Sequence, residues 1–136
     1  ILNDVADVTG TDGEKMSKSY GNTIPLFATR TEIQKSVMAI VTDSSGKRPE
    51  NVYSIHKLLK PEDELSELYA QNEGNYKLLK EALFEDMDAF IAPLREKRKQ
   101  ITDSQVKEVL AQGGKVAKEL VAEKMNEVRK KIGVAL

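Results

Sequence analysis

The chain has 136 residues, of which 40% are hydrophobic, 32% are charged and 5% are aromatic. A β-sandwich or β-barrel needs more β-branched and aromatic alternation, so this composition favours an all-α protein. The formal net charge of −1 excludes a chain that is basic throughout, and any contact with RNA must therefore come from local basic patches. Because the chain has no cysteine, disulfides and thiolate metal ligands are excluded, and we predict no metal site.

The start of the chain and its hydropathy indicate where the protein works. No stretch approaches the roughly 18 apolar residues of a membrane-spanning helix. The opening residues, Ile1-Leu2-Asn3-Asp4, carry no signal peptide. We therefore expect a cytoplasmic location and no membrane partner. Since the first residue is not Met, we also expect the chain to be a segment of a longer protein.

Residues 1–28 are rich in Gly, Asp, Ser and Thr and show no helical periodicity. Val5 and Val8 permit a short strand, which the turn-forming run of residues 10–13 would end. This part of the chain is therefore predicted to be an irregular segment that precedes the helices.

Helical periodicity starts at Thr29, and the rest of the chain is predicted to form a bundle of five or six helices with short loops. Thr29 and Glu32 have the spacing of a capping box, in which hydroxyl and carboxylate each accept from a free backbone N–H. The apolar face of this first helix is predicted to consist of Ile33, Val37 and Ile40.

Two shorter helices are predicted next, over residues 51–60 and from Pro61 to about residues 72–74. Pro61 can end one helix and begin the other, because its fixed φ and missing N–H suit a first helical turn. The side chains that these helices are expected to bury are Val52, Ile55, Leu58, Leu59, Leu65, Leu68 and Tyr69.

A long helix is predicted over residues 76–99, and Pro93 is expected to kink or break it because proline removes a helical hydrogen bond. Its predicted buried face consists of Leu79, Leu83, Met87, Phe90 and Leu94. Two helices should follow, one capped by Asp103 or Ser104 and closed by Gly113-Gly114, and one ending at Gly133. Their predicted apolar positions are Val106, Val109, Leu110, Ala117, Val121, Met125, Val128 and Ile132.

The stretch from Gly13 to Asn22 has the composition of a phosphate-binding loop. Lys15 and Lys18 each carry a compact positive charge on a flexible stem, and the nearby serine hydroxyls and loop amides are hydrogen-bond donors. Such a cluster suits a polyphosphate, although the glycine spacing is not that of a Walker loop. Because Lys and Ser are common in solvated loops, the residue types alone leave open a plain surface loop.

The run Lys15-Met16-Ser17-Lys18-Ser19 matches in full the signature loop of class I aminoacyl-tRNA synthetases. Other stretches resemble the tryptophanyl enzymes of that class, so that the resemblance covers essentially the whole chain: residues 11–14, 20–24, 38–44, 52–59 and 128–133. The second ATP signature of the class, of the His-Ile-Gly-His type, is absent, and so is the tryptophan pocket. The resemblance therefore implies a chain that is inactive by itself.

The resemblance implies a division of the chain and a set of partners. Residues 1–28 would be the C-terminal edge of the nucleotide-binding domain, and residues 29–136 would be the helical domain that binds the tRNA anticodon. The partners of the whole enzyme would be ATP as a substrate, Mg²⁺ accompanying it, tryptophan and tRNA(Trp). The whole enzyme would be a homodimer, whereas this chain would be a monomer because the dimer contacts lie mainly in the missing domain.

The resemblance also assigns roles within the loop. Lys15 and Lys18 would act in catalysis by lying near the departing phosphates, and Lys15, Met16, Ser17, Lys18 and Ser19 together would bind ATP. Ser17 and Ser19 would hold the loop geometry or donate to phosphate oxygens. Met16 would be an apolar anchor, and the loop would close over ATP during the reaction.

Two other features have a structural and a functional interpretation. Basic residues gather near two predicted helix ends, at residues 95–99 and 129–131, where the helix dipole favours cations whatever the function. Some of them could instead contact phosphates of the anticodon stem. The single histidine, His56, is interpreted as a surface or core-edge residue and not as a catalytic one.

Two alternatives to a tryptophanyl enzyme stay open. A tyrosyl-tRNA synthetase has the same architecture, although its signature loop commonly differs around Met16 and Ser17. The other alternative is a stand-alone helical RNA-binding module. The coding sequence upstream of Ile1 would distinguish this module from a synthetase, because it either encodes a nucleotide-binding domain or does not.

Overall fold

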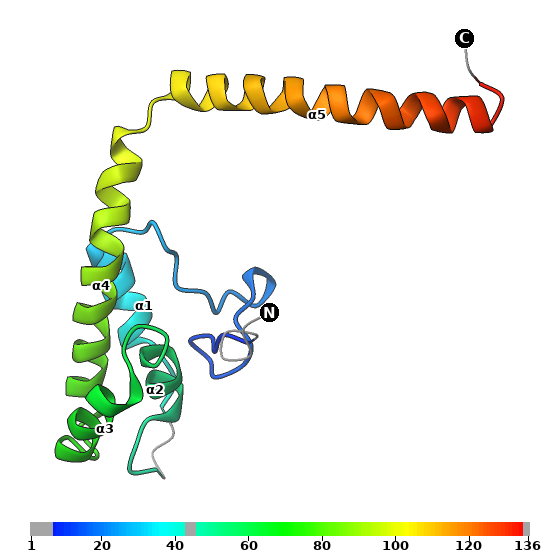
Figure 1. Cartoon of the computed structure of the whole chain (residues 1–136). Helices are drawn as coiled ribbons and strands as arrows, with labels where there is room; N and C mark the ends of the chain where they lie inside the picture. The colour runs from blue at the N-terminus through cyan, green and yellow to red at the C-terminus, as the bar shows by residue number, and fades with distance from the viewer. Residues whose placement is uncertain (1–6, 43–45, 135–136) are drawn as a thin grey trace. The chain divides into compact units, whose positions relative to one another are not determined.

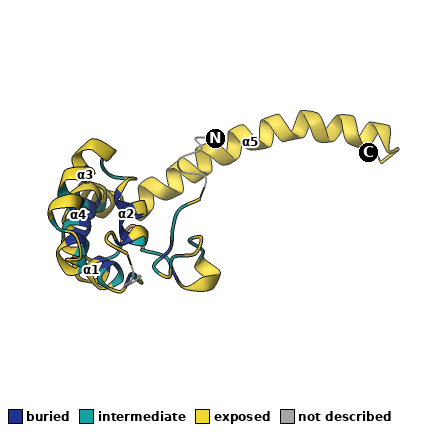
Figure 2. Cartoon of the chain, turned by 90° about the horizontal axis from the view of Figure 1, so that it is seen from below, coloured by how far each residue is buried: buried dark blue, intermediate teal, exposed yellow. Residues whose placement is uncertain are grey.

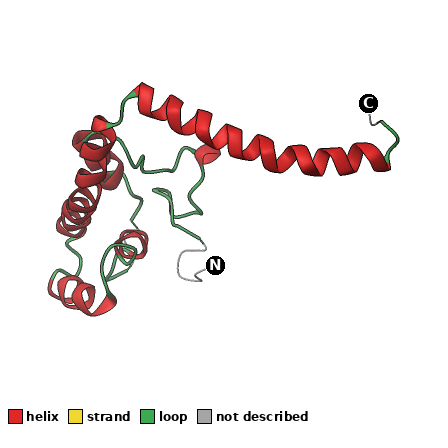
Figure 3. Cartoon of the chain, turned by 45° about the horizontal axis from the view of Figure 1, so that its top comes forward, coloured by secondary structure: helices red, strands yellow, loops and turns green. Residues whose placement is uncertain are grey.

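The computed structural model describes residues 7–42 and 46–134. Within these ranges the regular structure consists of five α-helices and one short 3-10 helix, and no strand is present (Figure 3). The prediction of an all-α fold is therefore confirmed. In place of the predicted short strand, the structure has a single isolated antiparallel bridge between Thr9 and Lys15, while Val5 lies outside the described residues.

The chain divides into two compact units, Ile1–Arg95 and Glu96–Leu136. The first unit contains α1 (Arg30–Met38), α2 (Glu50–His56), α3 (Glu62–Gln71) and most of α4 (Tyr76–Gln100), and the second contains α5 (Asp103–Lys131). Figure 1 shows these elements along the chain. The domain boundary predicted between residues 28 and 29 does not coincide with this division and stays a prediction.

Hydrogen bonds from side chains fix both ends of α1. Thr29 accepts a hydrogen bond from the backbone N–H of Glu32, whose carboxylate accepts from the backbone N–H of Thr29 at 2.8 Å. The predicted capping box at α1 is thus confirmed. At the other end of α1, the Lys80 ammonium donates to the carbonyls of Met38 and Ile40, at 3.0 and 2.7 Å, and ties this helix to α4.

The core lies between α1, α2 and α4, where the dark blue residues gather in Figure 2. The predicted face of α1 is confirmed, since Ile33, Val37 and Ile40 are buried. They pack with side chains from α2 and α4, namely Val52, Ile55, Leu83, Phe84, Met87 and Ile91. Two predictions for α2 are wrong: the helix ends at His56 and not at residue 60, and Leu58 in the following turn is 40% exposed.

A second cluster joins α3 to α2 and α4 through Tyr53, Leu65, Tyr69 and Leu79. His56 belongs to this region and is completely buried, so its interpretation as a surface or core-edge residue was wrong. Its Nε2 lies 2.9 Å from Asp86 Oδ2, and its Nδ1 lies 3.1 Å from the Tyr69 hydroxyl. A carboxylate only accepts, so Nε2 carries the proton and the Tyr69 hydroxyl donates to Nδ1. The polar atoms of His56 are therefore satisfied inside the core.

Helix α4 follows the predicted range closely, and Leu79, Leu83 and Met87 of its predicted buried face are buried. Pro93 does not break it, because the carbonyl that loses its partner belongs to Ala89, an exposed residue whose C=O can accept from water. Phe90 is 60% exposed and Leu94 is 37% exposed, against the prediction. The buried residues follow four-residue steps that drift around the helix away from Phe90. These residues are Leu79, Leu83, Met87 and Ile91, and Phe84 and Asp88, each one position further along, are buried beside them.

Helix α5 corrects the predicted end of the chain, because the two helices expected there are one. Its N-cap is Thr102 rather than Asp103 or Ser104, and Thr102 forms a capping box with Gln105. Gly113 and Gly114 do not end the helix, since neither adopts the positive φ of a C-terminal glycine. Gly133 does, at φ 74°, as predicted. None of the predicted apolar positions of this part of the chain is buried.

Candidate functional site

The predicted phosphate-binding residues lie in a closed loop held at its base by backbone hydrogen bonds. Met16 N donates to Val8 O and Gly10 N donates to Glu14 O, both at 2.7 Å. Thr11 N donates to Asn22 O at 2.9 Å, which brings the two ends of the loop together. The loop is therefore an ordered hairpin-like turn without a strand on either side.

Lys15 and Lys18, the predicted catalytic residues, are both exposed. The Lys15 ammonium forms an ion pair with Asp7, in which both side chains are 69% exposed. An exposed pair of this kind contributes little to stability, so Lys15 can exchange Asp7 for a phosphate at small cost. Lys18 is the first residue of the 3-10 helix η2 (Lys18–Tyr20), and the residue after this helix, Gly21, is in the left-handed conformation.

The serines and Met16 of the motif are placed differently from the lysines. The Ser17 and Ser19 hydroxyls lie 2.8 Å apart and form a hydrogen bond, so one of the two hydroxyls donates within the loop. Met16 and Ser17 are half-buried, whereas Ser19 is exposed. Within this segment the two lysines are thus more exposed than Met16 and Ser17.

Asn22 is a residue of the loop whose importance the sequence reasoning missed. Its side chain is 3% exposed and forms three hydrogen bonds within the loop. Its Oδ1 accepts from Ser17 N at 2.7 Å, and its Nδ2 donates to Asp12 Oδ1 at 2.8 Å and to Lys15 O at 3.1 Å. We call these three bonds the Asn22 bridge. The available signal in the sequence was an asparagine directly after Gly21, because asparagine side chains commonly hydrogen-bond to backbone groups in turns.

Asp12 and Gly10 support the Asn22 bridge. Asp12 Oδ1 also accepts from Glu14 N at 3.0 Å, and the hydrogen bond from Asn22 lowers the pKa of the Asp12 carboxyl. Asp12 is therefore ionised at neutral pH and accepts both bonds. Gly10 is buried directly against the Asn22 amide, and a Cβ at residue 10 would overlap it. A side chain at this position would displace the amide from its three partners.

The loop is joined to the helices through the segment that follows α1. Val41 N donates to Thr11 O at 2.7 Å, and the Asn51 side chain of α2 donates to Val41 O at 2.8 Å. The base of the loop thus has contacts with the chain after α1, which in turn contacts α2. The loop belongs to the same compact unit as these helices.

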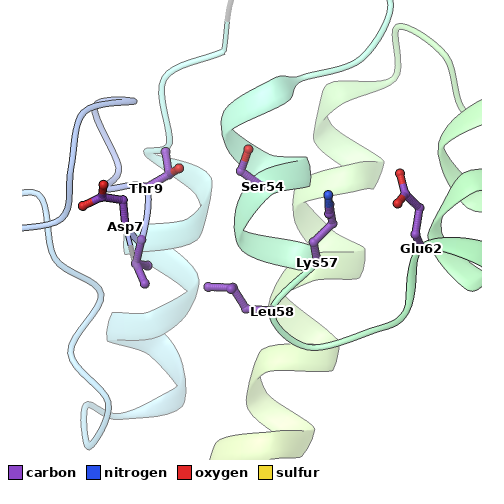
Figure 4. Close-up of a pocket in the computed structure, with 7 residues that line it drawn as sticks. Asp7, Thr9, Ser54, Lys57, Leu58 and Glu62 are labelled. Atoms are coloured by element: carbon purple, nitrogen blue, oxygen red, sulfur yellow. The ribbon is translucent and has the colours of Figure 1, made fainter. Parts of the chain in front are cut away.

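A cavity of about 580 Å³ lies beside the loop, between residues 7–9 and the helices α2 and α3 (Figure 4). The Lys57 ammonium and the carboxylates of Asp7 and Glu62 line it, together with Val8, Thr9, Ser54 and Leu58. None of the five predicted loop residues lines this cavity, although Asp7 pairs with Lys15. The cavity therefore adjoins the loop without containing its lysines.

The basic residues near the two helix ends differ in their surroundings. Arg95 pairs with the nearly buried Asp88 and donates to Ala28 O, so it holds α4 to the start of α1. Lys99 forms an exposed pair with Glu96 at 2.7 Å. Residues 129–131 form the last turn of α5 and are all exposed. Arg95 is thus structural, whereas the cations at the end of α5 are exposed side chains of a helix terminus.

Two properties of the described residues bear on metals and membranes. In residues 7–42 and 46–134, no group of three or more His, Asp or Glu side chains could hold a metal ion. Among the same residues, no helix is both long and apolar enough to cross a membrane.

Comparison with known proteins places the chain in a family. The family model described as tRNA synthetases class I (W and Y) matches residues 6–128. The tryptophan–tRNA ligase of Fusobacterium nucleatum is 35% identical over 98% of the chain and 44% of that protein. The tryptophan–tRNA ligase of Campylobacter jejuni is 37% identical over 98% of the chain and 46% of that protein.

A solved structure supports the same relationship. The crystal structure of the C. jejuni tryptophanyl-tRNA synthetase complexed with ADP and tryptophan matches with a TM-score of 0.83 and 37% identity, over 94% of this chain and 44% of that one. The chain belongs to the class I tRNA synthetases of the W and Y family. It spans less than half the length of these relatives.

Proposed function

We propose that the chain is the C-terminal part of a tryptophan–tRNA ligase, which activates tryptophan with ATP and transfers it to tRNA(Trp). The observation that carries this proposal is the complete motif Lys15-Met16-Ser17-Lys18-Ser19, held in an ordered loop with both ammonium groups exposed. The names of the relatives, tryptophan–tRNA ligase, favour this enzyme over the tyrosyl one. In the proposed reaction the tryptophan carboxylate attacks the α-phosphorus of ATP and pyrophosphate leaves.

The loop residues would act on the leaving pyrophosphate. Negative charge moves onto this group as the bond to the α-phosphorus breaks, and the exposed ammonium groups of Lys15 and Lys18 would stabilise that charge. Ser17 and Ser19 would donate to phosphate oxygens or keep the loop in shape through their mutual hydrogen bond. Half-buried Met16 would anchor the loop, and Mg²⁺ would accompany ATP in the whole enzyme.

The helical part would bind tRNA, and residues 29–136 would form that domain, with residues 1–28 as the edge of the nucleotide-binding domain. The exposed cations at residues 129–131 support this role, because contacts to phosphates position a nucleic acid without reading its bases. The whole enzyme would be a cytoplasmic homodimer. The chain by itself would be inactive, because it spans less than half the length of its relatives, and it would be monomeric, because the dimer contacts would lie mainly in the remaining part.

Amino-acid-dependent exchange of pyrophosphate into ATP by the full-length enzyme tests the proposal. We expect exchange with tryptophan and not with tyrosine, and charging of tRNA(Trp). Exchange with tyrosine alone would assign the chain to the tyrosyl enzyme instead. A full-length protein that exchanges with neither amino acid but binds RNA would support a stand-alone RNA-binding module.

A further inference from the structure

We propose that Asn22 is a positioning residue for the reaction, which fixes the directions of Lys15 and Lys18 through the Asn22 bridge. This inference rests on the proposed function of the loop. Asn22 does not reach outward as the lysines do, because its side chain is 3% exposed and all its bonds end on the loop itself. It would therefore act through the lysines and not on ATP.

The bridge holds the backbone on both sides of Met16. The Lys15 carbonyl and the Ser17 amide, which flank that residue, both bind the Asn22 side chain, at 3.1 and 2.7 Å. Lys18 follows Ser17 directly and begins η2. Fixing these two backbone groups fixes where both lysine side chains leave the loop. Removal of the amide would leave this part of the loop free to take other conformations.

Only an asparagine side chain fits all three bonds. The amide offers an acceptor to Ser17 N and donors to Asp12 and Lys15 O in one planar group. Aspartate has the same shape but would turn a second carboxylate toward ionised Asp12 and toward a carbonyl. Alanine would leave the Ser17 N–H and the Asp12 carboxylate without this partner. Glutamine carries the same amide on a longer stem, which would move the amide away from these three partners.

The bridge is separate from what holds the unit together. The base of the loop keeps its own backbone bonds, such as Met16 N to Val8 O, and the core of α1, α2 and α4 contains none of the bridging residues. A loss of the bridge should therefore change the lysine positions far more than the folding of the helices. A misplaced catalytic group lowers the rate of the chemical step more than the binding of substrate.

The test measures pyrophosphate exchange in the full-length enzyme for Asn22→Ala and Asn22→Asp. Both should lower kcat by about tenfold or more, with the KM for tryptophan changed less than about twofold and the melting temperature nearly unchanged. Asp12→Asn, which keeps an acceptor oxygen, should cost less than Asn22→Asp. The matched control is Asn72→Ala, which removes an amide that donates to Leu68 O at the end of α3 and should leave kcat unchanged.

The double variant Asn22→Ala/Lys18→Ala tests whether Asn22 acts by positioning the lysines or contributes to the rate independently of them. If Asn22 acts through both lysines, its loss should lower kcat by a smaller factor once Lys18 is gone, because only the part that acts through Lys15 is left. Full multiplication of the two effects would overturn the inference, and so would an unchanged kcat in Asn22→Asp, the variant that preserves side-chain volume. If Lys18→Ala itself leaves exchange unchanged, the proposed function of the loop fails, which distinguishes that failure from a failure of the Asn22 inference alone.

Discussion

Helices α4 and α5 have the same type of amphipathic sequence, but only α4 buries its apolar side chains. Both are long, with 25 and 29 residues, and both are amphipathic with cations in the last turn. Helix α4 buries six side chains, including Leu79, Leu83 and Ile91, whereas α5 buries none. The apolar pattern of a helix thus reports which face can be buried, and it does not report whether the chain supplies a partner for that face.

The difference implies two sources of helix stability in one chain. The buried part of α4 is stabilised by packing against α1 and α2. The described residues of α5 instead have a capping box at Thr102 and side-chain pairs along the helix, such as Lys124 with Glu127. Capping and pairs of this kind contribute about 1 kcal/mol or less each. Substitutions in the two helices should therefore have effects of different size and cause.

The largest effect on stability is expected in the core of α4. Leu83 is fully buried between α1 and α2, so Leu83→Ala should lower the free energy of unfolding by about 2–5 kcal/mol, from lost burial and the cavity left behind. The matched variant in α5 is Val121→Ala, at a side chain that is 56% exposed, and its effect should stay within about 0.5 kcal/mol. Urea unfolding of the chain measures both values, and equal effects would contradict the comparison.

A pH-dependent effect is expected from buried His56. Burial lowers the pKa of His56, against the opposing hydrogen bond with Asp86, so the folded chain holds the neutral form. The unfolded chain protonates near pH 6.5. Stability is therefore fully present above this pH and should fall as the pH drops below it, by at most about 1.4 kcal/mol per pH unit for one proton.

His56 is the only histidine, which makes this effect assignable. The variant His56→Gln should be less stable overall, because Asp86 and Tyr69 lose a partner. Its urea midpoint should nevertheless change little between about pH 7 and pH 5.5. If the variant keeps the slope of the parent chain in this window, the assignment to His56 is wrong.

The smallest effects are expected at the glycines of α5. Gly113 and Gly114 lie in the helix interior, and the space that an alanine methyl would take at either position is open, so alanine at either site should add about 1 kcal/mol to helix stability. Gly133 is the matched control, because its φ of 74° suits glycine and Gly133→Ala should destabilise the helix end. Circular dichroism and amide hydrogen exchange of α5 check both directions. A loss of helicity in Gly113→Ala would contradict a continuous helix.

The sequence predicted a structural feature well where that feature depends only on residues close to it in the chain. The capping box of Thr29 with Glu32, the start of α3 after Pro61 and the left-handed Gly133 all depend on neighbours within one turn. Positions whose environment depends on distant residues were predicted less well. Buried His56 requires Tyr69 and Asp86 from two other helices, and exposed Phe90 depends on how α4 turns against α1.

The candidate site shows the same division. Its charged residues could be named from the motif, because the residue types and their spacing are all contained in five positions. The Asn22 bridge could not be predicted from the motif, because it joins positions 12, 15, 17 and 22 through the folded shape of the loop. Likewise, the glycine pair at 113–114 indicated a helix end, but a glycine stops a helix only when the chain turns left-handed there.

The role of the loop lysines is tested most directly by Lys18→Ala in the full-length enzyme. The exposed ammonium would stabilise charge that develops on pyrophosphate, so it should matter more in the transition state than in the ground state. We expect tryptophan-dependent pyrophosphate exchange to slow by about a hundredfold. Tryptophan affinity should barely change, ATP affinity should fall less than the rate, and Lys18→Arg should restore activity only in part.

Lys35→Ala, which removes an exposed lysine of α1 outside the loop, is the control and should leave exchange unchanged. The decisive measurement therefore compares two changes that Lys18→Ala causes in the enzyme: the loss of exchange rate and the change in tryptophan affinity. A large loss of rate with unchanged tryptophan affinity is the predicted result. Unchanged exchange kinetics, or a loss of tryptophan binding as large as the loss of rate, would contradict the assignment of this loop to the leaving pyrophosphate.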